Sequence, residues 1–160
     1  MARVVLARQA KCPFLCWKGL RGVLCRILRE YEARGTLSVA LVDDDEMRRV
    51  HREFLGEDAV TDVVSFRLDE PSAGPHEDVL GEIVISVERA RGEALRRGKP
   101  PHEELALYAI HGALHLVGFD DGNAGDRREM RRVERKYSRL YARAAAGSGS
   151  RAGGGSRLST

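Results

Sequence analysis

The chain has 160 residues, of which 42% are hydrophobic and 32% charged, with a formal net charge of +3. This composition is typical of one globular domain around a single core. No apolar run approaches the ~20 residues of a membrane-spanning helix, and the apolar run before Arg8 is too short for a signal peptide. We therefore predict a cytoplasmic protein. The small positive charge is compatible with a nucleic-acid partner but does not establish one.

The first quarter of the chain predicts a strand, a helix and a second strand. Residues 3–8 favour a short strand, and apolar residues spaced by three and four over residues 13–31 predict an amphipathic helix. Gly35 ends that segment, and residues 37–42 predict the second strand. The cysteines are odd in number and lack the spacing of a metal site, so we expect free, buried thiols at Cys12, Cys16 and Cys25.

A run of acidic residues, 43–46, follows the second strand. Asp43 is placed to cap a helix that extends through Phe54, with the other acids in its first turn. Helix initiation explains this cluster better than a metal site does. Beyond it, the sequence predicts a strand, an exposed loop and another strand at residues 60–66, 69–78 and 81–87.

Three helices are predicted after the last strand. The first covers residues 88–97 and ends at Gly98, and the second begins near Pro101. This second helix is apolar nearly all round, which is typical of a central, buried helix.

The third of these helices covers residues 126–143 and has an apolar inner stripe. Its other face is rich in arginine, interleaved with Glu129 and Glu134. We interpret that face as solvated, with a phosphate-tracking surface as the alternative. Glycine and serine predict a flexible tail at residues 145–160, so residues 1–144 are expected to form a single domain.

The predicted buried helix carries a motif of candidate metal ligands. His111 and His115 are four residues apart and share one helix face. Gly118 is suited to end the helix, and Asp121 follows after the turn. The spacing H-x3-H-x2-G-x2-D is that of a metzincin zinc site with aspartate as third ligand. Two imidazoles and one carboxylate leave a fourth position open, as a catalytic zinc requires.

Several alternatives stay open for this motif. The histidines could be core residues, Asp121 could serve only as a turn residue, and Asp120 could compete for the ion. A zinc peptidase carries a glutamate directly after the first histidine as its general base. Gly112 occupies that position here, which argues against a peptidase.

Three blocks stand in order along the chain: Thr61-Asp62-Val63-Val64-Ser65-Phe66, Leu80-Gly81-Glu82-Ile83-Val84-Ile85-Ser86, and residues 111–121. Together they resemble the YbeY-type single-strand endoribonucleases, which are bacterial factors of ribosomal RNA maturation. The resemblance implies an α+β fold, with a small mixed sheet of about four strands wrapped by helices and the zinc site on a central buried helix.

The resemblance assigns roles to individual residues. His111 and His115 match the family's first two zinc ligands, and Asp121 stands where the third is usually histidine. Leu55 replaces an arginine that the family uses in RNA cleavage, and His51 stands where asparagine is common. Candidate substitutes for that arginine are Arg52, Arg67 or a helix arginine, and the sequence does not choose among them.

The resemblance therefore implies a metal-dependent hydrolase with residues 1–144 as its catalytic domain and one zinc ion held by His111, His115 and Asp121. Its expected activity is single-strand-specific cleavage of RNA in small-subunit rRNA end processing and ribosome quality control. Single-stranded, ribosomal RNA is the expected partner, with ribosomal proteins as further candidates. The alternatives are a non-cleaving, zinc-containing ribosome-assembly factor, which Leu55 favours, and a metallopeptidase, which Gly112 opposes.

Overall fold

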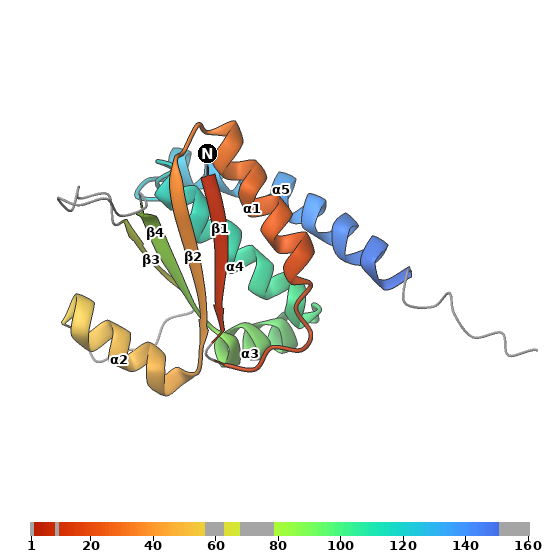
Figure 1. The fold of residues 1–160 in the computed structure, drawn as a ribbon, viewed down its shortest axis with the longest axis horizontal. Coiled ribbons are helices and arrows are strands. Elements are labelled where there is room, and N and C mark those ends of the chain that lie inside the picture. The colour runs from red at the N-terminus through yellow and green to blue at the C-terminus, as the bar shows by residue number, and fades with distance from the viewer. Residues whose placement is uncertain (1, 9, 57–62, 68–78, 151–160) are drawn as a thin grey trace, which may run out of the picture.

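The computed structural model describes residues 2–8, 10–56, 63–67 and 79–150, and their central element is a four-stranded sheet (Figure 1). The strands are β1 (Ala2–Arg8), β2 (Gly35–Val42), β3 (Val63–Arg67) and β4 (Val79–Ser86). Their order is β1-β2-β4-β3, in which β1, β2 and β4 are parallel and β3 is antiparallel to β4. The predicted small mixed sheet is thus confirmed.

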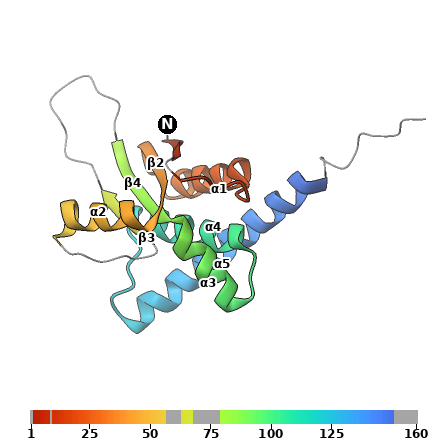
Figure 2. The ribbon, with the colours of Figure 1, turned by 90° about the horizontal axis from the view of Figure 1, so that it is seen from below.

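The helices are α1 (Trp17–Glu30), α2 (Asp44–Leu55), α3 (Val87–Arg97), α4 (Pro101–Leu116) and α5 (Ala124–Ser150). Alternate residues of β2 face opposite sides of the sheet, as the strand period requires. Leu37, Val39 and Leu41 join the large core with α1, α3, α4 and α5. Ala40 and Val42 pack with Met47 of α2 on the opposite face (Figure 2). The predicted α+β class is confirmed.

The acidic residues at the start of α2 serve the helix and its neighbour. The Asp43 carboxylate accepts a hydrogen bond from the backbone N–H of Glu46 at 2.8 Å, which is the predicted helix cap. Ser86 at the end of β4 donates to Asp44 Oδ1 at 2.8 Å and so joins α2 to the sheet. The structural interpretation of this cluster is confirmed.

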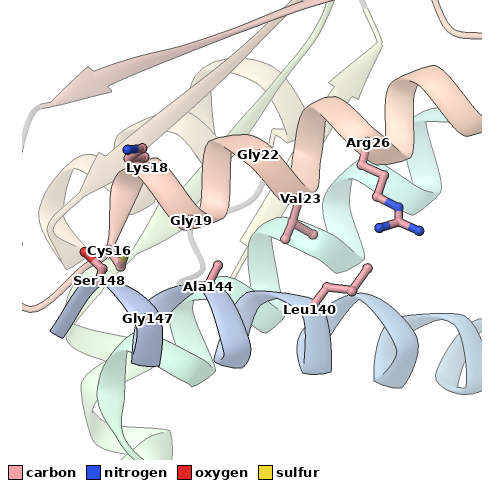
Figure 3. A pocket seen from close by; sticks show the side chains of 10 residues that line it. All are labelled: Cys16, Lys18, Gly19, Gly22, Val23, Arg26, Leu140, Ala144, Gly147 and Ser148. Carbon is pink, nitrogen blue, oxygen red and sulfur yellow. The ribbon is translucent and has the colours of Figure 1, made fainter. Parts of the chain in front are cut away.

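Helix α5 is longer than predicted, because residues 145–150 are helical rather than part of an unstructured tail. It lies against α1, as Figure 3 shows. A Cβ placed at Gly19 of α1 would lie 3.2 Å from Ala144 Cβ, so the missing side chain lets the helices approach closely. Packing against α1 thus offsets the low helix propensity of glycine at the end of α5. A cavity of about 520 Å³ lies between these two helices near Gly22 and Gly147.

Some predicted features fall outside the described residues. They are the 60–62 part of the third predicted strand, the loop at 69–78 and the tail at 151–160. The three cysteines, all within the described residues, form no disulfide, as predicted, but they are half-buried rather than fully buried. Across the described part of the chain, no helix combines the length and the apolar character needed to cross a membrane.

Candidate metal centre

Helix α4 holds the candidate site and runs through the centre of the helical layer, as predicted (Figure 1). Pro101 occupies its first turn, and ten of its residues are buried. The helix ends where Gly118 adopts a φ of 110°, a conformation that favours glycine. Phe119 N–H then donates back to Leu114 O at 3.0 Å. This closure turns the chain and returns Asp121 toward the last turn of α4.

Three side-chain atoms meet at the end of α4. His111 Nε2 and His115 Nε2 are 3.0 Å apart. Asp121 Oδ2 lies 3.9 Å from His111 Nε2 and 3.6 Å from His115 Nε2. Ligand atoms bound to a tetrahedral zinc ion at ~2.0–2.1 Å are roughly 3.3 Å from one another. The three separations lie on either side of that value, so the group could hold a metal ion.

The hydrogen bonds behind the histidines fix which ring nitrogen faces the site. His111 Nδ1 lies 2.5 Å from Glu134 Oε1, and His115 Nδ1 lies 3.0 Å from the carbonyl oxygen of Phe119. Both partners are acceptors, so in each neutral ring Nδ1 carries the hydrogen and Nε2 carries a lone pair. In this neutral form two lone pairs and a carboxylate oxygen converge, an arrangement that a bound cation would stabilise.

The Asp120 side chain binds backbone N–H groups, unlike that of Asp121. Its Oδ1 accepts hydrogen bonds from the backbone N–H of Asp121 at 2.7 Å and from that of Gly122 at 3.2 Å. These bonds form the turn that positions Asp121. Of the two adjacent aspartates, Asp121 is the one whose carboxylate joins the histidines.

Gly112 lies between the two histidines in the chain and faces the sheet. A Cβ at this position would lie 3.0 Å from Ile83 Cγ2 on β4, and Ile83 is fully buried. Helix α4 therefore sits against the sheet at the position where a zinc peptidase carries its glutamate. No side chain fits there without displacing Ile83, which agrees with the sequence-based argument against a peptidase.

A family profile described as Endoribonuclease YbeY matches residues 16–142, which is most of the chain. The chain belongs to the YbeY endoribonuclease family. The resemblance carried by the three sequence blocks is thereby confirmed.

Individual YbeY relatives agree with the profile. Endoribonuclease YbeY of Desulfitobacterium hafniense is 44% identical over 104 residues, which are 61% of this chain and 66% of that protein. The protein of the same name from Syntrophotalea carbinolica is 32% identical over 145 residues, which are 89% of this chain and 96% of the relative. A solution structure of a Thermotoga maritima protein superposes with a TM-score of 0.68 at 28% identity, covering 98% of this chain and 100% of that one.

Sequence reasoning missed Glu134, which it placed on the solvated face of the last helix. The Glu134 side chain is only 13% exposed and contacts His111 of the candidate site. The position of Glu134 relative to the apolar residues of the helix indicates that it faces inward. Glu134 follows the buried Met130 by four residues and precedes the buried Tyr137 by three, so it belongs to the inner stripe of α5.

The structure also separates the arginines proposed as substitutes at Leu55. Arg52 and Leu55 lie in α2, which packs on the opposite face of the sheet from α4 (Figure 2). Arg127 of α5 lies beside the site, because its Nη1 donates to the Asp121 carbonyl oxygen at 3.4 Å. Arg67 is the last residue of β3. Among these arginines, Arg127 is thus placed next to the loop that carries Asp121.

Proposed function

We propose that this YbeY-family chain is a zinc-dependent, single-strand-specific endoribonuclease whose metal and catalytic residues are His111, His115 and Asp121. The observation that carries the proposal is the convergence of two lone-pair nitrogens and a carboxylate oxygen. The three side chains are 28–45% exposed, so a polymer can reach them. A structural zinc site, by contrast, is closed to solvent by its four protein ligands.

Zinc fits this donor set because it favours imidazole and carboxylate ligands, and three ligands leave a position for water or substrate. When bound, the ion would supply Lewis-acid polarisation of a phosphoryl oxygen and activation of water. The chain's own contribution is to hold the ligands rigidly. Helix α4 fixes both histidines, and the turn that Asp120 stabilises fixes Asp121.

The basic face of α5 supports an RNA substrate. Its exposed side chains in the first turns of the helix include Arg127, Arg128 and Arg131. Arg127 also donates a hydrogen bond to the Asp121 carbonyl oxygen, so a phosphate backbone bound along these arginines would pass beside Asp121. Positive side chains bind phosphates without reading the sequence. The family name supports cleavage of RNA, and within the cell we assign the chain to small-subunit rRNA end processing and ribosome quality control.

The chemistry of cleavage has two routes that leave different ends. Attack by the RNA's own 2′-hydroxyl leaves a cyclic phosphate, whereas attack by water leaves a 5′-phosphate and a free 3′-hydroxyl. Gly112 offers no general base for either route. Analysis of the termini of cleaved RNA therefore identifies the nucleophile.

A metal assay tests the site directly. The purified parent should contain about one zinc ion per chain, and His115→Ala should lose most of it, because two ligands remain. His102→Ala is the matched control: His102 lies on the same helix, but its Nδ1 contacts the Tyr141 hydroxyl instead. Equal zinc in the parent and in His115→Ala would refute the site.

An activity assay tests the reaction. The parent should cleave single-stranded RNA, lose this activity when a chelator removes the metal, and leave casein intact. RNA binding without cleavage would favour the alternative, a zinc-containing ribosome-assembly factor, which the exposed Leu55 in place of the family arginine supports. Cleavage of casein would favour a peptidase.

A further inference from the structure

Of the two glutamates in α5, one faces the site and the other faces solvent. The Glu134 side chain is 13% exposed, and its Oε1 lies 2.5 Å from His111 Nδ1. The Glu129 side chain is 52% exposed and pairs with Arg132 on the same helix. The two glutamates thus have the same chemistry but different surroundings.

The contact with Glu134 restricts the orientation of the His111 ring. A half-turn of the imidazole about its Cβ–Cγ bond would exchange the positions of Nδ1 and Cδ2 and move Nε2 away from His115. The carboxylate opposes this rotation, because only Nδ1–H can donate to Oε1. His115 is held by a different partner, the Phe119 carbonyl oxygen at 3.0 Å. Each histidine therefore has its own acceptor.

The two acceptors differ in charge. A backbone carbonyl is neutral, whereas the Glu134 carboxylate carries a full negative charge close to the His111 ring. A carboxylate behind a histidine raises the basicity of the opposite nitrogen and strengthens it as a metal ligand. The packing of α5 against α4 brings this charge to His111 from a separate part of the chain.

We propose that Glu134 is a positioning residue of the metal centre, which orients His111 and strengthens its Nε2 as a ligand. The inference rests on the proposed metal site. It assigns to α5 a role in building the centre, beyond carrying a basic face. Mutation of the residue that accepts a hydrogen bond from a metal-bound histidine typically weakens metal binding by about 10–100-fold.

The test compares Glu134→Ala, Glu134→Gln and the surface control Glu129→Ala. Zinc affinity is measured by competition with a chromophoric chelator, and the visible spectrum of the cobalt(II)-loaded protein reports the ligand geometry. Glu134→Ala should lose about 10–100-fold in zinc affinity and alter the cobalt spectrum. Glu134→Gln keeps an acceptor but not the charge, so it should restore part of the loss. Glu129→Ala should match the parent.

Unfolding of the metal-free proteins separates positioning from simple packing. If Glu134 only joins α5 to α4, Glu134→Ala will lower stability, while the folded variant will bind zinc with the parent's affinity and cobalt spectrum. That result would overturn the proposal. His115→Ala, measured alongside, separates the two levels of inference. Zinc lost in His115→Ala but kept in Glu134→Ala refutes the positioning role alone, whereas zinc kept in His115→Ala refutes the metal site itself.

Discussion

The close contact between α4 and the sheet predicts that Gly112→Ala destabilises the protein, although alanine is the better helix former. The new Cβ would lie 3.0 Å from Ile83 Cγ2 and 3.2 Å from its Cδ1 and Cγ1. Carbon atoms pack best at about 3.5–4.0 Å, so α4 or Ile83 has to move by about 0.5 Å. Ile83 is fully buried and β-branched, so its side chain has few alternative rotamers.

The magnitude follows from two opposing effects. Overpacking of a core costs about 1–3 kcal/mol, and replacing a helical glycine with alanine gains about 1 kcal/mol. The net effect should be a loss of about 1 kcal/mol, or about 2–4 °C in Tm for a domain of this size. Gly92 in α3 is the matched control, because a Cβ there meets nothing within 4 Å. Gly92→Ala should therefore gain about 1 kcal/mol.

Urea unfolding of the metal-free proteins measures both effects, and a double-mutant cycle locates their cause. Ile83→Ala removes all three atoms that the new Cβ would meet. In that background Gly112→Ala should become stabilising, by about the 1 kcal/mol of helix propensity. If Gly112→Ala stabilises the parent as much as Gly92→Ala does, the contact between α4 and β4 is looser than described and the reasoning fails.

Three further predictions concern the site, the core and the substrate. Asp121→Ala should lose most of its zinc by elemental analysis, whereas Asp120→Ala should keep it because that carboxylate serves backbone N–H groups; the reverse pattern would identify the wrong aspartate. Tyr137→Phe should lower the free energy of unfolding by about 1–2 kcal/mol at neutral pH, because its hydroxyl donates to Glu30 and, as the main cause, lowers the pKa of that carboxyl to about 2. Since the folded-state pKa is depressed, this difference should be present above the ordinary glutamate pKa and disappear as the pH falls toward 2 in urea titrations. Affinity for single-stranded RNA should fall steeply between low and moderate salt in a binding titration, and a flat response would contradict phosphate binding by α5.

The sequence alone predicted those features that depend only on residues close together in the chain. The cap at Asp43, the break at Gly98 and the buried character of α4 follow from residues adjacent in the chain, and each is found in the structure. The ligand spacing belongs to the same class, because a helix and a glycine turn bring His115 and Asp121 together within seven residues.

Features that depend on contacts between distant segments were not predicted. The end of α5 is rich in glycine and serine, and its helical state reflects packing near Gly19, more than a hundred residues earlier. Glu134 was assigned to solvent from the charge of its side chain, although its spacing places it on the inner stripe. An acid whose side chain is only 13% exposed needs a partner, and the partner, His111, lies on another helix. Only the tertiary structure brings the two together.

With Asp121 as the proposed third ligand, the charge balance of the centre would differ from that of a three-histidine site. Asp121 and Glu134 bring two carboxylates to a site whose histidines would bind a metal as neutral ligands, and the C-terminal end of α4 adds a partial negative charge. This set matches a dication, and it leaves less net positive charge to attract a phosphate than three histidines would. Arg127 contacts the Asp121 carbonyl oxygen, so its guanidinium supplies positive charge beside the centre. Under the proposed function, we therefore expect the basic face of α5 to contribute more to RNA binding in this chain than in a relative with three histidine ligands.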